Sequence, residues 1–148
     1  MSVFRNVSAS PDDPVETWPT EAVQAALERG GLKLWHRLAV AIAADPWGPV
    51  ARSVEEVLSH SRPYGISETM QAVLAAARAA AARGERQEVA REVAGIVRRS
   101  GLTKEQFASR IGTSAPRLST YLSGQVVPSA ALMVRIRRVG GAVGSFVG

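Results

Sequence analysis

The chain has 148 residues, of which 46% are hydrophobic and 21% charged, as is typical of a folded protein. It has neither an apolar run of the roughly 18 residues that span a bilayer nor a secretion signal. We therefore expect a cytoplasmic protein. With no cysteine and only two histidines, His36 and His60, disulfides and thiolate metal sites are excluded, and we expect no metal, no cofactor and no enzymatic activity. Residues 1–76 carry 6 basic and 9 acidic side chains, and residues 77–148 carry 12 and 4, which indicates that the C-terminal half binds a polyanion.

The N-terminal part of the chain is predicted to form a small helical domain behind an arm. Residues 1–19 contain three prolines and no apolar period, so we predict an extended arm that Trp18 attaches to the rest. Apolar spacing and breaks at glycine and proline predict three short helices, over residues 20–29, 32–44 and 49–59. We assign the domain to residues 20–84 and expect it to serve dimerisation or partner binding.

An alanine-rich stretch follows the predicted turn at residues 62–65. The sequence AVLAAARAAAAR is a very strong helix former, so we predict a helix that begins at Ser67. Gly84 weakens this helix by about 1 kcal/mol relative to alanine. Either the helix continues to Ser100 or a joint lies near Gly84, and we expect a break or kink there.

Residues 102–129, LTKEQFASRIGTSAPRLSTYLSGQVVPS, have the caps and the turn of two short helices. Thr103 and Gln106 form a capping box, Gly112 suits a left-handed turn, and Ser114 can cap the second helix. Ser129 can cap a closing helix. The residues expected to face a common core are Val89, Val93, Ile96, Val97, Phe107, Ala108, Ile111, Leu118, Tyr121, Leu122, Leu132, Met133 and Ile136.

This pattern resembles the helix-turn-helix of the Cro and phage-repressor class, often called the xenobiotic-response-element family, over about residues 88–139. The resemblance implies an all-α protein in which the N-terminal helical domain precedes a lambda-repressor-like domain at residues 85–139, with a tail at residues 140–148. It also implies a sequence-specific DNA-binding regulator, a repressor, that acts at the nucleoid as a homodimer on double-stranded DNA.

The resemblance implies that the helix over residues 115–123 enters the major groove. By family position, the base-reading residues are Ser114, Ala115, Arg117, Ser119 and Thr120, and the residues on the DNA backbone are Thr103, Lys104, Ser123 and Gln125. Arg117 can bind a guanine in bidentate fashion or hold a phosphate, and both roles stay open. Ala115 and Pro116 replace polar residues that many relatives use, which leaves apolar contact with a thymine methyl there. Further charge, near the DNA or simply solvated, comes from Arg98, Arg99, Arg110, Arg135, Arg137 and Arg138.

Other interpretations stay open. The dimer interface can lie on the N-terminal helices around Trp35 and Val54 or on the tail from Val139 to Val147. The main alternative function is an antitoxin that binds its toxin through the acidic N-terminal region, with the arm folding on binding, and represses its own operon. A third is an interaction module without a DNA role. We expect His36 to be a structural histidine with its hydrogen bonds satisfied.

Overall fold

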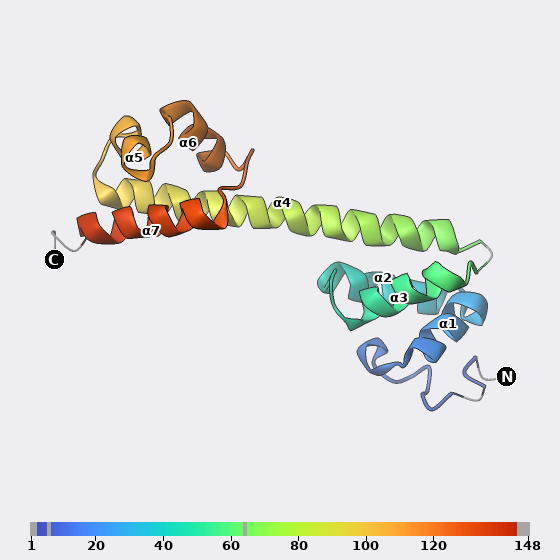
Figure 1. Cartoon of the computed structure of the whole chain (residues 1–148). Coiled ribbons are helices and arrows are strands. Elements are labelled where there is room, and N and C mark those ends of the chain that lie inside the picture. The colour runs from blue at the N-terminus through green and yellow to red at the C-terminus, as the bar shows by residue number, and fades with distance from the viewer. Residues whose placement is uncertain (1–2, 6, 64, 145–148) are drawn as a thin grey trace. The chain divides into compact units, whose positions relative to one another are not determined.

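The computed structural model describes residues 3–5, 7–63 and 65–144. These residues form helices, turns and loops without a β-strand, so the predicted all-α fold class is confirmed. The chain divides into two compact units, residues 1–81 and 82–148 (Figure 1). None of the helices in the described ranges combines the length and the apolar content that crossing a membrane requires.

The N-terminal unit contains a 3₁₀ helix η1 (Val15–Thr17), α1 (Thr20–Arg29), α2 (Gly31–Ala44), α3 (Pro49–His60) and the first part of α4. The bounds of α1 are those predicted, and α2 and α3 differ from their predicted bounds by one residue. Helices α1, α2 and α3 pack against one another. The largest fully buried side chains of this unit are Val23, Leu27, Leu38, Ile42, Val54, Val57 and Met70.

The segment before α1 is packed, and the prediction of an extended arm is wrong for its described part. Phe4 and Trp18 are only 4% and 5% exposed, and their rings meet edge to face with centroids 4.8 Å apart. Arg37 of α2 donates to the carbonyl of Asp13 (2.8 Å), and its guanidinium lies 5.2 Å from the centroid of the Trp18 ring. Scattered apolar residues without a helical or strand period gave no sign of this burial in the sequence.

Helix α4 (Ser67–Ser100) is continuous through Gly84, where we expected a break or kink. One glycine costs about 1 kcal/mol, and the alanine, arginine, glutamate and glutamine residues on both sides are strong helix formers. The helix therefore continues across the boundary between the two units at residues 81 and 82. Residue 64, in the turn predicted before α4, lies outside the described residues.

The C-terminal unit consists of the second part of α4 with α5 (Lys104–Ile111), α6 (Ala115–Leu122) and α7 (Ala130–Gly144). Helix α7 runs beside α4 in the same direction, and α5 and α6 lie on one side of this pair (Figure 1). The largest fully buried side chains are Val93, Phe107, Ile111, Leu118 and Ile136. Helix α7 extends to Gly144, into the tail that we assigned to residues 140–148, and residues 145–148 lie outside the described residues.

Candidate functional site

The start of α5 is fixed by its predicted capping box. The backbone N–H of Gln106 donates to Thr103 Oγ1 (3.1 Å), and the backbone N–H of Thr103 donates to Gln106 Oε1 (2.9 Å). Two of the amide groups that a helix start leaves without partners are thereby satisfied. Lys104 is the first residue of the helix and is exposed. Thr103 and Lys104, two of the predicted contacts with the DNA backbone, thus lie at the start of α5.

The turn between α5 and α6 depends on Gly112. Its backbone is left-handed, with φ 78° and ψ 34°, a conformation that costs most other residues about 1 kcal/mol or more. Arg135 of α7 also donates from Nη1 to the carbonyl of Ile111 (3.0 Å). This bond places a positive charge at the C-terminal end of α5, where the helix dipole favours it. The turn can therefore be confined to residues 112–114.

Helix α6 begins at its predicted cap and buries one face. The backbone N–H of Arg117 donates to Ser114 Oγ (3.2 Å), and Pro116 occupies the first turn, where its missing N–H has no partner to lose. Leu118 is fully buried and Tyr121 is 4% exposed. At 3.6 residues per turn, burial of these two side chains leaves the opposite side of the helix to solvent.

The five predicted base-reading residues lie along the part of α6 that is open to solvent. Ser114 and Arg117 are exposed, and Ala115, Ser119 and Thr120 are half-buried. The hydroxyl of Thr120 donates to the carbonyl of Arg117 (2.6 Å), so its lone pairs remain available to a donor. Pro116 is exposed on the same side, which fits only an apolar contact at that position.

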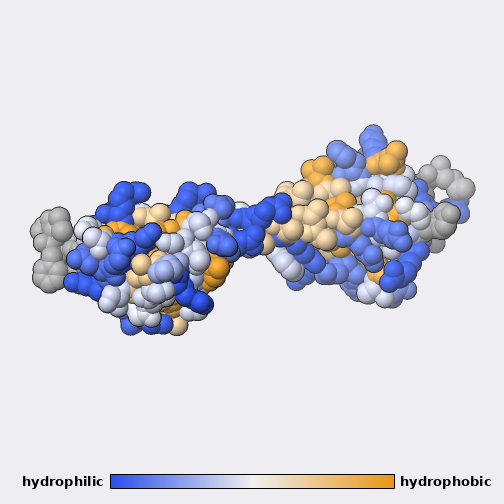
Figure 2. Space-filling model, turned by 90° about the horizontal axis from the view of Figure 1, so that it is seen from above, coloured by the Kyte–Doolittle hydropathy of each residue, from blue (hydrophilic) through white to orange (hydrophobic). Residues whose placement is uncertain are grey.

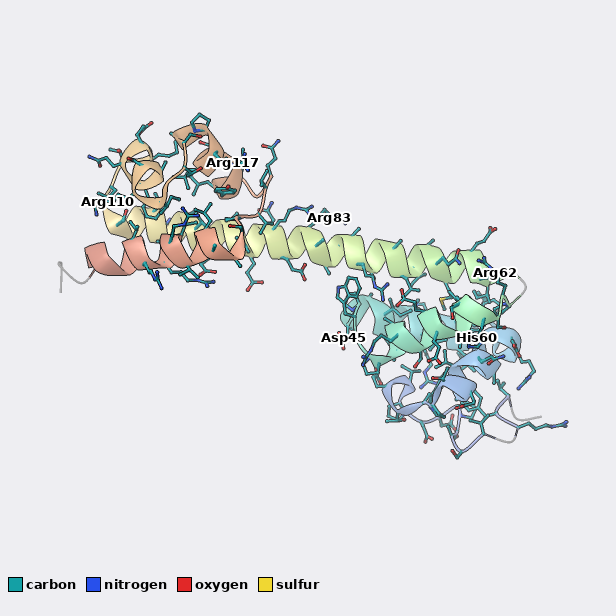
Figure 3. The ribbon with its side chains drawn as sticks, viewed as in Figure 1. Asp45, His60, Arg62, Arg83, Arg110 and Arg117 are labelled. Atoms are coloured by element: carbon teal, nitrogen blue, oxygen red, sulfur yellow. The ribbon has the colours of Figure 1, made fainter. Side chains whose placement is uncertain are left out.

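Tyr121 orients Arg117. The Nε–H of Arg117 donates to the hydroxyl of Tyr121 (3.2 Å), while the ring of Tyr121 is buried in the core. The two Nη groups of Arg117 have no hydrogen-bond partner among the described residues. Figure 3 labels Arg117 on α6 and Arg110 on α5. The fold thus holds one edge of the Arg117 guanidinium and presents the other, which carries the pair of donors that a bidentate contact needs.

Lys104 and Ser119 come together across the two helices. Lys104 Nζ donates to Ser119 Oγ (2.9 Å), and the Ser119 hydroxyl donates to the carbonyl of Ala115 (3.2 Å). A predicted backbone contact and a predicted base reader therefore share one hydrogen bond. Among the hydroxyl-bearing residues of the five, Ser119 is the least available, because its hydroxyl both donates and accepts within the protein.

The two remaining predicted backbone contacts follow α6. The hydroxyl of Ser123 donates to the carbonyl of Thr120 (3.1 Å) and accepts from the backbone N–H of Gln125 (3.3 Å). Ser123 and Gln125 are both exposed. Ser123 and Gln125 thus lie at the C-terminal end of α6, while Lys104 reaches the middle of this helix at Ser119.

The charge of the chain after α5 begins is predominantly positive. Glu105 is the last acidic residue of the sequence, and five arginines follow it. Of these, Arg135 bonds the carbonyl of Ile111, and Arg137 pairs through Nε with Glu92 (2.9 Å), both side chains being exposed. The hydrogen bond to Glu92 raises the pKa of Arg137, so the side chain stays charged. Arg110, Arg117 and Arg138 form no ion pair among the described residues, and their charges face solvent.

Neither histidine belongs to this region. His36 is exposed on α2 and has no protein hydrogen-bond partner in the part of the chain that the structure describes, so its role as a structural histidine stays a prediction. His60 is the last residue of α3. Within the described ranges, no three His, Asp or Glu side chains lie close enough to hold a metal ion.

Comparison of the chain with protein-family models, with curated proteins and with solved structures gave no match.

Sequence reasoning missed two interactions that shape the region. The sequence suggests Arg135 only as a charge near DNA or in solvent. In the structure it donates a hydrogen bond to the carbonyl of Ile111 at the end of α5, 24 residues earlier in the sequence. Tyr121 was predicted only as a core residue, and it also holds Arg117. The spacing of four residues on one helix could have indicated the second interaction. The first had no local signal.

Proposed function

We propose that the C-terminal unit binds double-stranded DNA and reads its sequence through the open face of α6, and that the protein is a transcriptional repressor acting as a homodimer. The observation that carries the proposal is the arrangement of α5 and α6. Two capped helices of 8 residues each are joined by a tight left-handed turn, and the second buries Leu118 and Tyr121 while its polar side stays open. An α-helix of this kind fits the major groove.

The charge distribution supports the same function. Contacts between phosphates and basic side chains supply a large share of the affinity of such proteins. Helices α6 and α7 carry no acidic residue, and Lys104 and Arg110 of α5 are exposed beside them. Figure 2 shows hydrophilic side chains over much of the visible surface of this unit. If the unit neutralises several phosphates, the logarithm of the affinity falls with the logarithm of the salt concentration, with a slope of about −0.9 for each phosphate.

Selection of bound sequences from random duplex DNA tests the proposal. We expect a palindromic site with half-sites about 10 base pairs apart. The change Arg117→Ala is expected to weaken binding to that site by about 10- to 100-fold and to relax the preference at one base pair, since a bidentate contact with guanine discriminates by about 1–3 kcal/mol. The matched control is Arg62→Ala, which removes the same charge from an exposed position in the N-terminal unit and should leave binding unchanged.

Two outcomes would correct or refute the proposal. Equal weakening on all sequences would assign Arg117 to a phosphate and leave base reading to other residues of α6. If no duplex is retained even at low salt and no sequence is enriched, the C-terminal unit does not bind DNA, and the proposed function fails.

The antitoxin alternative gains no support from the fold. In that alternative, residues 1–19 are the segment that folds when the toxin binds. In the structure Phe4 and Trp18 already lie in the core of the N-terminal unit, so the described part of this segment has little left to order. A protein partner for this unit stays a prediction, and co-purification with a toxin would be its test.

A further inference from the structure

Helix α2 presents an apolar face that no described residue of its own unit covers. Leu32 is 81% exposed and Val40 is 54% exposed, and His36, Ala43 and Ala44 are exposed as well. Residues 32, 36, 40 and 43 are spaced by three or four positions, so they lie on one side of the helix. Isolated exposed apolar residues are ordinary, but a row of them along one helix indicates an interaction surface.

The charges at the two ends of α2 indicate what covers this face. Helix α2 contains no acidic residue. Lys33 stands in its first turn and Asp45 is its C-cap, so each charge lies at the end where the helix dipole disfavours it. Both side chains are exposed, and neither forms an ion pair within the described residues. These two charges do not stabilise the helix on which they stand.

A second, antiparallel copy of α2 would reverse this situation. In an antiparallel pair with a twofold axis near residue 40, positions whose numbers add up to about 79 lie opposite one another. Lys33 would then lie beside Asp45 of the second copy, at the negative end of that helix. Leu32 would face the turn that carries Trp47, which is 62% exposed, and Val40 would meet its own copy. The face is therefore complementary to itself in charge and in apolar character, as a twofold interface must be.

We propose that the chain forms a homodimer through an antiparallel pairing of α2 from two copies. A groove beside this face is lined by Pro14, Val15, Val40, Ala41 and Ala44, with Glu16, His36 and Arg37 among them, and its apolar part leaves room for side chains of the second copy. The inference goes beyond the proposed function by placing the dimer contact in the N-terminal unit. It requires no DNA, so its test and the test of DNA binding can fail separately.

The mass of the full chain in solution tests the pairing. Sedimentation without DNA should give a dimer for the natural sequence and a monomer for Val40→Glu, because the change places two carboxylates at the twofold axis. The matched control is Val134→Glu on α7, where the valine is likewise exposed, at 42%, and the dimer should persist. Circular dichroism should show the same helix content for all three proteins, since both valines are exposed.

A charge reversal distinguishes this pairing from a general apolar contact. Lys33→Asp and Asp45→Lys are each expected to weaken the dimer by about tenfold or more, because each places like charges opposite one another twice. The double change Lys33→Asp with Asp45→Lys should restore it. A natural chain that is monomeric at high concentration, a Val40→Glu variant that remains dimeric, or a double change that restores nothing would each overturn the proposal. A monomer would leave the face to a different protein.

Discussion

The two units of this protein fix the starts of their helices in different ways. In the C-terminal unit, side-chain oxygens of Thr103, Ser114 and Ser129 accept backbone N–H groups at the starts of α5, α6 and α7. In the N-terminal unit, α1, α2 and α3 begin after Pro19, Gly30 and Gly48 without a side-chain cap. The comparison indicates that side-chain caps fix the starts of the short helices in the proposed DNA-binding unit, whereas breaks at proline and glycine set those of the N-terminal unit.

The largest effects should come from the two cores. The change Phe107→Ala is expected to reduce the stability of the C-terminal unit by about 3–5 kcal/mol, and Leu38→Ala that of the N-terminal unit by about 2–5 kcal/mol, because both side chains are fully buried and each change leaves a cavity. Hydrogen exchange followed along the chain should show faster exchange only in the unit that carries the change. The two cores are separate clusters, so faster exchange across both units after either change would contradict their independence.

The difference in capping also explains how much the sequence could predict. The start of α5 at Lys104 and of α6 at Ala115 followed from Thr103, Gln106 and Ser114, whose signals are local. The packing of Phe4 against Trp18 could not be predicted, because it joins residues 14 positions apart without any period. The bond from Arg135 to Ile111 depends on how α7 crosses the turn, and only the folded unit brings them together.

Continuity through Gly84 shows a different limit of sequence reasoning. A glycine in a helix lowers its stability, but whether the helix breaks depends on the residues on both sides. In this chain they are strong enough helix formers that α4 continues. A glycine at position 112, in contrast, ends a helix. Its backbone is left-handed, with a φ of 78°, and it lies between Ile111, the last residue of α5, and Ser114, the cap of α6.

Effects of intermediate size should come from removing a helix cap. The change Thr103→Ala is expected to lower stability by about 1 kcal/mol, since it removes the acceptor of the Gln106 N–H. Thr20→Ala is the matched control, because Thr20 begins α1 without acting as a cap, and it should change stability by less than about 0.5 kcal/mol. Thermal unfolding of the two variants measures the difference. Equal losses at both positions would mean that capping does not distinguish the two units.

The smallest effect concerns the ion pairs of the two units. In the N-terminal unit Arg78 is largely covered, with 18% of its side chain exposed. Arg78 donates hydrogen bonds to the carboxylate of Glu55 (2.6 Å) and to the carbonyl of Pro46 (3.1 Å). Its guanidinium carbon also lies 4.1 Å from the centroid of the Trp47 ring. In the C-terminal unit Arg137 and Glu92 are both exposed. Solvent screens an exposed pair more strongly, so the pair of the N-terminal unit should contribute more.

The pH dependence of stability tests this expectation. The hydrogen bond from Arg78 lowers the pKa of Glu55, so the contribution of the pair is complete above the ordinary glutamate pKa of about 4.3 and is lost as the pH falls through the lowered value. Because the Glu55 side chain is 54% exposed, we expect Glu55→Gln to cost less than about 1 kcal/mol at pH 7. Denaturant unfolding should show this difference shrinking as the pH falls below the ordinary glutamate pKa of about 4.3, with Glu92→Gln as the control that loses less. If the difference stays constant with pH, Glu55 acts through packing, and its charge does not stabilise the unit.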